Sequence, residues 1–147
     1  EEVNSRMPEH VVQLVSDGLN EDRKPMKGSN VLLLGVAYKK DVNDVRESPA
    51  LSIIDRLRAK GANVKYHDPF VPEVRFDDAH TDAVGEPLSS VSLTNEELES
   101  ADCVIIVTDH SEIDYKRVCS LTPLIVDTRN ALNGDVRRES RARVIRL

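Results

Sequence analysis

The chain has 147 residues and a net charge of −6, from 26 acidic and 20 basic residues, and 39% of its residues are hydrophobic. This balance indicates one globular domain and argues against a disordered chain, which would be poorer in apolar residues. An acidic surface repels nucleic acid and anionic lipid, and no apolar stretch approaches the roughly 18 residues of a membrane span. Cys103 and Cys119 lack CxxC spacing and follow no secretory signal, so we expect reduced thiols in a cytoplasmic protein.

An amphipathic helix is predicted at the start of the chain. Apolar residues recur at steps of three and four from Val3 to Leu19, and Pro8 either kinks this helix or lies in its first turn. We expect the apolar stripe to contact a partner helix. The chain opens at Glu1 within this pattern, which suggests a piece of a longer protein, and the polar residues 20–30 form a surface connection.

Strands and helices are predicted to alternate through the rest of the chain. The apolar run 31–37 is typical of a parallel strand buried on both faces, and Ser48-Pro49 predicts a helix with Ser48 as N-cap and Pro49 as first residue. The other expected elements are strands at 62–68, 91–93, 103–108, 124–127 and 144–147, helices at 94–100 and 114–120, a capping box at Thr94 and Glu97, and a long loop at 70–87. The predicted fold class is α/β, a Rossmann-like doubly wound parallel sheet preceded by an amphipathic helix.

Polar residues at the carboxyl ends of these strands are the candidates for ligand binding, because loops and helix N-termini converge at that edge of the sheet. Lys39, Lys40 and Arg46 follow the first strand, and Arg129 follows the strand at 124–127. Cations at one edge of an acidic protein favour an anionic ligand such as a diphosphate. Solvated loop charges explain the spacing equally well.

Asp68, His110 and a lone glycine complete the candidates at this edge. Asp68 follows a strand where a ribose-binding acid would lie, but Asp68-Pro69 favours a structural turn, and His110 has no nucleophile assigned and is more often incidental. Only Gly35 stands where a dinucleotide fingerprint requires three glycines, so NAD is not expected to bind here in the usual way. The sequence predicts no catalytic residue and no metal site.

The run from Gly35 to Ala50, GVAYKKDVNDVRESPA, resembles the opening of the C-terminal, UDP-binding domain of the UDP-glucose/GDP-mannose dehydrogenase family. Further segments follow in the family's order, namely Tyr66-His67-Asp68-Pro69, Ala101-Asp102, Thr108-Asp109-His110 and Asp127-Thr128-Arg129-Asn130, while Asn4 and Met7-Pro8 resemble the end of its long central helix. The amino-acid sequences of these segments resemble dehydrogenases of UDP-N-acetylhexosamines more closely than UDP-glucose enzymes.

The resemblance implies that residues 1–20 are the tail of a central dimerisation helix, 21–30 a linker and 31–147 the UDP-binding domain. The full enzyme would oxidise the C6 alcohol of a UDP-sugar to the carboxylate in two NAD-dependent steps through a cysteine-bound intermediate. NAD would be held mainly by an N-terminal domain of the same polypeptide, and the enzyme would be a homodimer. The chain alone would not turn over substrate.

The resemblance also implies roles for four residues. Tyr38 and Lys39 match an aromatic-lysine pair that contacts the nucleotide sugar, and Arg129 matches a second substrate-binding position. Arg46 matches an arginine that faces NAD in the assembled enzyme.

Two other functions fit the pattern of elements. One is a stand-alone regulatory module that binds nucleotides without chemistry. The other is a receiver-like phosphoacceptor, which is less favoured because the acids surround lysine and arginine instead of forming a metal-binding cluster.

Overall fold

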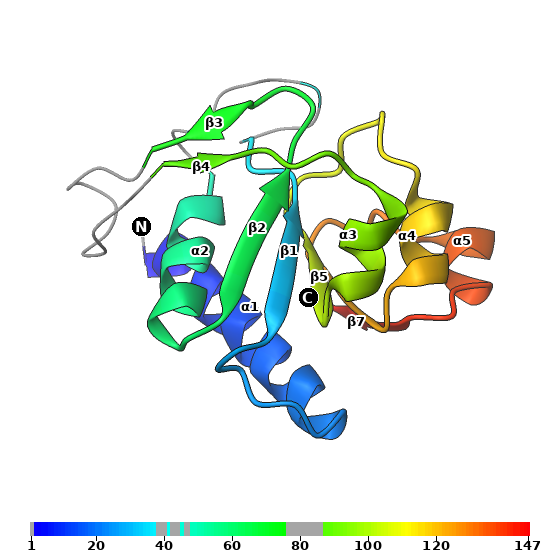
Figure 1. The fold of residues 1–147 in the computed structure, drawn as a ribbon, viewed down its shortest axis with the longest axis horizontal. Coiled ribbons are helices and arrows are strands. Elements are labelled where there is room, and N and C mark those ends of the chain that lie inside the picture. Colours follow the sequence, from blue (N-terminus) through cyan, green and yellow to red (C-terminus); the bar gives the residue numbers. More distant parts are fainter. Residues whose placement is uncertain (1, 38–40, 42–44, 46–47, 76–86) are drawn as a thin grey trace.

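The computed structural model describes residues 2–37, 41, 45, 48–75 and 87–147. In these residues five parallel strands form a sheet in the order β2-β1-β5-β6-β7, and β3 pairs with β4 in a small antiparallel sheet (Figure 1). The elements in chain order are α1 (Glu2–Glu21), β1 (Asn30–Leu34), α2 (Ala50–Ala59), β2 (Asn63–His67), β3 (Glu73–Val74), β4 (Leu88–Ser89), α3 (Asn95–Ser100), β5 (Cys103–Ile106), α4 (Tyr115–Leu121), β6 (Leu124–Asp127), α5 (Gly134–Arg138) and β7 (Arg143–Arg146).

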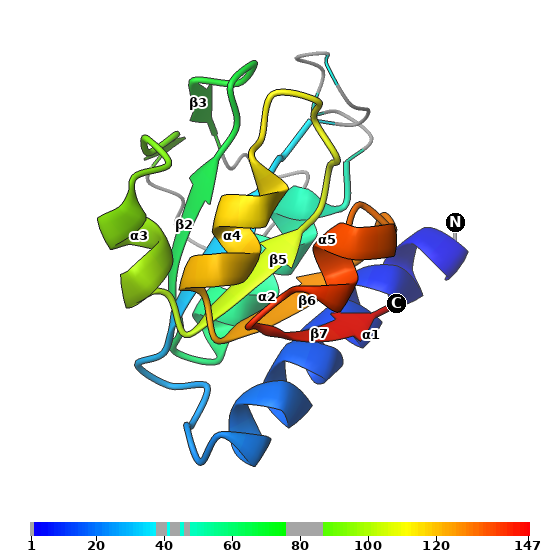
Figure 2. The same ribbon diagram turned by 90° about the vertical axis from the view of Figure 1, so that its right-hand side faces the viewer.

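Helices cover both faces of the parallel sheet (Figures 1 and 2). Side chains alternate along β1, so that Val31 and Leu33 join a core with α1 and α2, while Leu32 and Leu34 join a second core with α3 and α4. This two-sided burial explains why the strands are continuous apolar runs without polar alternation. The doubly wound α/β prediction is therefore confirmed.

The apolar stripe of α1 is buried within this chain. Val11, Val15 and Leu19 are fully buried and lie in the same core as α2 and β6. The guanidinium of Arg143, in β7, donates to the carbonyl of Gly18 and to the Asp22 carboxylate, at 2.9 Å each. The helix thus covers one face of its own sheet, and the expectation that this stripe meets a partner helix is wrong for these residues.

Several predicted boundaries differ in the structure. Pro8 lies inside α1 and does not begin it, and α2 has Pro49 as N-cap while the Ser48 hydroxyl accepts from the Ala50 amide at 3.1 Å. The 91–93 strand is absent among the described residues, and β4 lies just before it. At α3 the Thr94 hydroxyl caps the Glu97 amide at 3.1 Å, but the Glu97 carboxylate binds Lys65, so only half of the capping box forms.

The strand order places a topological switch point between β1 and β5, since the chain proceeds outward from β1 in both directions. Loops leave neighbouring strands in opposite directions at such a point, which opens a crevice at the carboxyl edge where ligands of doubly wound proteins bind. In the part of the chain that the structure describes, no helix is long and apolar enough to cross a membrane.

Candidate functional site

The exit of β1 is packed directly against the exit of β5. Gly35 has a φ of +86°, and a Cβ placed on it would lie 2.5 Å from Cβ of Thr108. The Thr108 hydroxyl donates to the carbonyl of Ala37 at 2.6 Å. Because Gly35 has no side chain, the loops after β1 and β5 can pack against each other.

A buried carboxylate holds the backbone at the β1 exit. Asp68 follows β2, is 2% exposed, and its Oδ2 accepts the amides of Val36 at 2.8 Å and Ala37 at 3.1 Å. Its Oδ1 accepts the amide of Phe70 at 2.8 Å in the turn that follows. Asp68 has the structural role favoured from the sequence, and that role extends across the sheet to β1.

His110, after β5, is fully buried and joins Asp68 to the far end of the β1 loop. Its Nε2 lies 2.9 Å from Asp68 Oδ2, and its Nδ1 accepts the amide of Asp41 at 2.7 Å. An amide can only donate, so Nδ1 carries no hydrogen and Nε2 donates to Asp68, which makes the ring neutral. His110 thus has a structural role that the sequence did not indicate.

A second buried aspartate organises the loop after β6. Asp127 is 1% exposed; its Oδ1 accepts the amides of Arg129 and Ala131 at 3.1 Å, and its Oδ2 accepts that of Leu132 at 2.9 Å. The side chain of Arg129 is 43% exposed, and its Nε lies 3.9 Å from Oδ1 of Asp109, the residue before His110. This loop brings a partly exposed guanidinium to the exit of β5.

The structure describes one of the four predicted binding residues. Arg129 lies in the loop after β6, next to the exit of β5, whereas Tyr38, Lys39 and Arg46 lie outside the described residues. Ala37 and Asp41, on either side of the first two, are described and held by the contacts above.

The described residues of the β1 exit do not fit NAD. In a dinucleotide-binding fold the amides after the first strand are directed at the pyrophosphate. Here the amides of Val36 and Ala37 already donate to Asp68, so they are not directed at a pyrophosphate. The cofactor is therefore not assigned to this edge of the chain.

The two buried aspartates are not suited to binding a metal ion, and the two cysteines are not suited to nucleophilic catalysis. The carboxylates of Asp68 and Asp127 are occupied by amide donors, and the described residues contain no cluster of three potential metal-ligating side chains. Cys103 and Cys119 are buried, and that burial raises the pKa of both thiols, the opposite of what a nucleophilic cysteine requires. Their prediction as core residues is confirmed.

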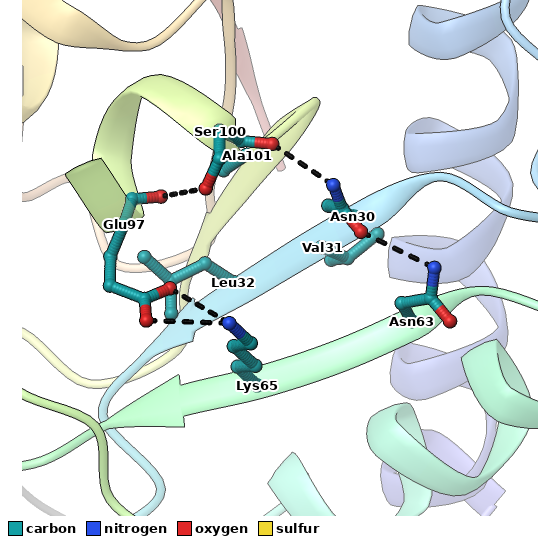
Figure 3. Close-up of a pocket in the computed structure, with 8 residues that line it drawn as sticks. All are labelled: Asn30, Val31, Leu32, Asn63, Lys65, Glu97, Ser100 and Ala101. Carbon is teal, nitrogen blue, oxygen red and sulfur yellow. Dashed lines mark hydrogen bonds and ion pairs between the residues drawn. The ribbon is translucent and has the colours of Figure 1, made fainter.

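A small cavity lies at the opposite edge of the sheet. It measures about 70 Å³ and is bordered by Asn30 and Asn63, the first residues of β1 and β2, and by the Lys65–Glu97 ion pair at 3.2 Å (Figure 3). Ligand pockets typically measure several hundred Å³. This cavity is therefore too small for a nucleotide and lies away from the switch point.

A more open hollow lies beside the Arg129 loop. It measures about 430 Å³, and its lining residues are Asn130, Asn133, Gly134, Arg137, Arg138 and Arg146. The exposed Arg138 pairs with Asp135 at 3.1 Å, and Arg146 contacts Asn130. The carboxyl ends of β6 and β7 are thus locally basic although the chain as a whole is acidic.

Sequence reasoning missed the partnership of Asp68 and His110 because it joins residues 42 positions apart. Both residues follow strands that flank β1 in the sheet. Had the strand order been known, that shared neighbour would have identified them as a pair. The Asp41 contact had no sequence signal.

A family model described as "UDP-glucose/GDP-mannose dehydrogenase family, UDP binding domain" matches residues 32–134. The UDP-glucose 6-dehydrogenase of Rickettsia bellii is 35% identical over 137 residues, which cover 90% of this chain and 30% of that protein. The UDP-N-acetyl-D-mannosamine dehydrogenase of Methanocaldococcus jannaschii is 30% identical over 143 residues, covering 92% and 29%.

Solved structures give the same result. The NDP-N-acetyl-D-galactosaminuronic acid dehydrogenase of Methanosarcina mazei Go1 matches with a TM-score of 0.75 and 27% identity, over 99% of this chain and 30% of that one. A UDP-glucose dehydrogenase of Pyrobaculum islandicum matches with a TM-score of 0.71 and 27% identity, over 99% and 30%. The chain therefore spans about 30% of the length of the curated relatives it matches.

Proposed function

The chain belongs to the UDP-glucose/GDP-mannose dehydrogenase family, in which it corresponds to the UDP-binding domain, and from that premise we propose that it binds the UDP part of a UDP-sugar at the switch point between β1 and β5. Tyr38, Lys39 and Arg129 are the proposed contacts. The proposed UDP-sugar is a UDP-N-acetylhexosamine or UDP-glucose, since the relatives that match the chain include a UDP-N-acetyl-D-mannosamine dehydrogenase and a UDP-glucose 6-dehydrogenase.

The observation that carries this proposal is the placement of Arg129. Asp127 holds the Arg129 backbone, and the partly exposed guanidinium is directed toward the β5 exit. A guanidinium is the side chain best suited to bind a diphosphate, because it offers several donors in a planar fork. A ligand at this position would bridge the loops after β1, β5 and β6.

We further propose that this domain is the C-terminal part of an NAD-dependent UDP-sugar 6-dehydrogenase. The whole protein would oxidise the C6 alcohol to a carboxylate, and an N-terminal domain of the same polypeptide would supply NAD and the catalytic cysteine. Arg46 would face that NAD. We expect the whole protein to be a cytoplasmic homodimer, with residues 1–20 as the tail of its central helix and 21–30 as a linker.

Titration of the 147-residue chain with UDP tests the binding proposal. We expect saturable binding by calorimetry, and we expect Arg129→Ala to weaken it about tenfold or more, because a hydrogen-bonded charge is lost. Arg56→Ala is the matched control. Its side chain is 41% exposed, close to the 43% of Arg129, but it lies on α2 and pairs with Glu9.

Two results would contradict the proposal. One is no heat of binding with UDP for the unmodified chain under conditions in which it is folded. The other is an equal loss of affinity in both arginine variants, which would indicate an effect of overall charge instead of a contact at the switch point.

A further inference from the structure

The pair formed by Asp68 and His110 lies beneath the switch point, where a ligand cannot touch it. Both side chains are fully buried, and their 2.9 Å contact passes under the exit of β1, since β2 and β5 lie on either side of that strand. A buried carboxylate is costly unless its oxygens are hydrogen-bonded. Here Oδ2 of Asp68 accepts three donors, so the pair is satisfied and fixed.

Asp68, one member of the pair, holds the backbone at the exit of β1. Asp68 accepts the amides of Val36 and Ala37, while the Thr108 hydroxyl donates to the carbonyl of Ala37 at 2.6 Å. Both backbone groups of Ala37 are therefore held by side chains from neighbouring strand ends. The peptide that leads into residue 38 has a defined starting point.

His110, the other member of the pair, holds the backbone at Asp41. His110 accepts the amide of Asp41 at 2.7 Å, and the Asp41 carboxylate accepts the amide of Ser111 at 3.0 Å and its hydroxyl at 2.9 Å. Asp41 has a φ of +62°, a backbone conformation that costs a non-glycine residue free energy. Such a conformation persists when surrounding contacts determine it, and those contacts come from His110 and Ser111.

We propose that Asp68 and His110 are positioning residues for UDP binding, which hold the backbone at Ala37 and at Asp41, on either side of the proposed contacts Tyr38 and Lys39. This inference rests on the proposed function. Because the backbone at Ala37 and Asp41 is already held, it does not have to be ordered when a ligand binds, and the binding free energy is not reduced by that cost. His110 is suited to this task because a neutral imidazole donates at one nitrogen and accepts at the other.

Two substitutions at His110 separate the two contacts. The amide oxygen of Asn can take the place of Nδ1 and accept from Asp41, but Asn is too short to reach Asp68. The amide of Gln reaches the place of Nε2 and can donate to Asp68, but it loses the acceptor for Asp41. Both variants remove one buried hydrogen bond, so they should destabilise the fold by similar amounts.

The experiment is calorimetric titration of the 147-residue chain with UDP, together with amide hydrogen exchange. We expect His110→Gln to weaken UDP binding about fivefold or more and to accelerate exchange of the Asp41 amide. His110→Asn should bind UDP within about twofold of the unmodified chain, with Asp41 still protected. Val104→Ala, in the core on the α3 and α4 side, is the control that lowers stability without touching the pair.

The outcomes distinguish this inference from the proposed function. If the unmodified chain does not bind UDP, the proposed function fails and the inference falls with it. If the unmodified chain binds UDP but His110→Gln and His110→Asn bind it equally well or equally poorly, the positioning role alone is overturned. Should the His110 variants not fold, Thr108→Val serves instead, since it is isosteric and removes the hydrogen bond to Ala37; unchanged UDP affinity in that folded variant would overturn the inference.

Discussion

Gly35 is the residue on which the packing of the switch point depends. Replacement by alanine would combine a left-handed backbone conformation with a contact of 2.5 Å between the new Cβ and Cβ of Thr108. The backbone N and O of Thr108 would also lie within 3.0 Å of it. We expect Gly35→Ala to lower the free energy of unfolding by about 2–4 kcal/mol, because conformational strain and overpacking each cost about 1–2 kcal/mol or more. Urea denaturation measures this change.

Gly28 provides the control for that substitution. Its φ of +87° matches that of Gly35, but no atom lies within 4 Å of a Cβ built on it. Gly28→Ala should therefore cost only the conformational part, about 1–2 kcal/mol. Equal destabilisation by the two variants would show that crowding against Thr108 contributes nothing.

Single residues at the candidate site were predicted as positions but not as partners. The sequence identified Arg129, Asp68 and His110 because each follows a strand, and the structure confirms that all three lie at the carboxyl edge. It could not identify which backbone amides Asp68 and Asp127 accept, since those contacts depend on where the strands lie side by side. Tyr38, Lys39 and Arg46 remain predictions.

At the scale of elements, α1 is an integral layer of this fold. Leu19 is fully buried against the sheet, so truncation to alanine removes core contacts and leaves a cavity. We expect Leu19→Ala to lower the free energy of unfolding by about 2–5 kcal/mol, and Gln13→Ala, on the exposed face of the same helix, to change it by less than about 0.5 kcal/mol. Chemical denaturation compares the two.

The opposite result would mean that α1 is not an integral layer of the fold. If Leu19→Ala unfolds at the same denaturant concentration as the unmodified chain, then α1 detaches from the sheet in solution and its stripe is free for another partner. The contacts of Arg143 with Gly18 and Asp22 argue against detachment, because they fasten the end of α1 to β7.

Elements with a strong apolar period were predictable, and short ones were not. The runs that became β1, β5 and β6 have all of their central residues buried, which is the pattern of a parallel strand. By contrast, β3 and β4 have two residues each, too few to show alternation, and α5 contains one apolar residue in five. The strand at 91–93 was mistaken because its neighbours at 88–89 make the pairing with β3 instead.

At the scale of the whole molecule, alternation of strands and helices predicts a doubly wound sheet but not the order of its strands. That order decides the site, because only the sequence β2-β1-β5-β6-β7 places the loops of β1 and β5 at a switch point and Asp68 opposite His110. The overall charge of −6 gives no hint of a basic edge, which arises from folding Arg129 and the arginines around α5 to one side.

The exposed surface of the described residues predicts that this chain is a monomer by itself. Leu147 is the only large hydrophobic side chain among them that is exposed, at 49%, and the stripe of α1 is covered by the chain's own core. Stable homodimer interfaces are typically apolar at their centre. Light scattering during gel filtration should therefore give a mass near 16.4 kDa at every concentration tested.

A mass that rises with concentration toward twice that value would contradict this prediction. Leu147→Ser then tests whether the exposed C-terminal leucine is responsible, since that substitution leaves both cores intact. The proposed homodimer of the whole enzyme imposes a sharper condition. If a chain of the relatives' full length is dimeric while these 147 residues are monomeric, the contacts that stabilise the dimer must include residues that this chain lacks, because α1 already uses its apolar stripe to cover the sheet.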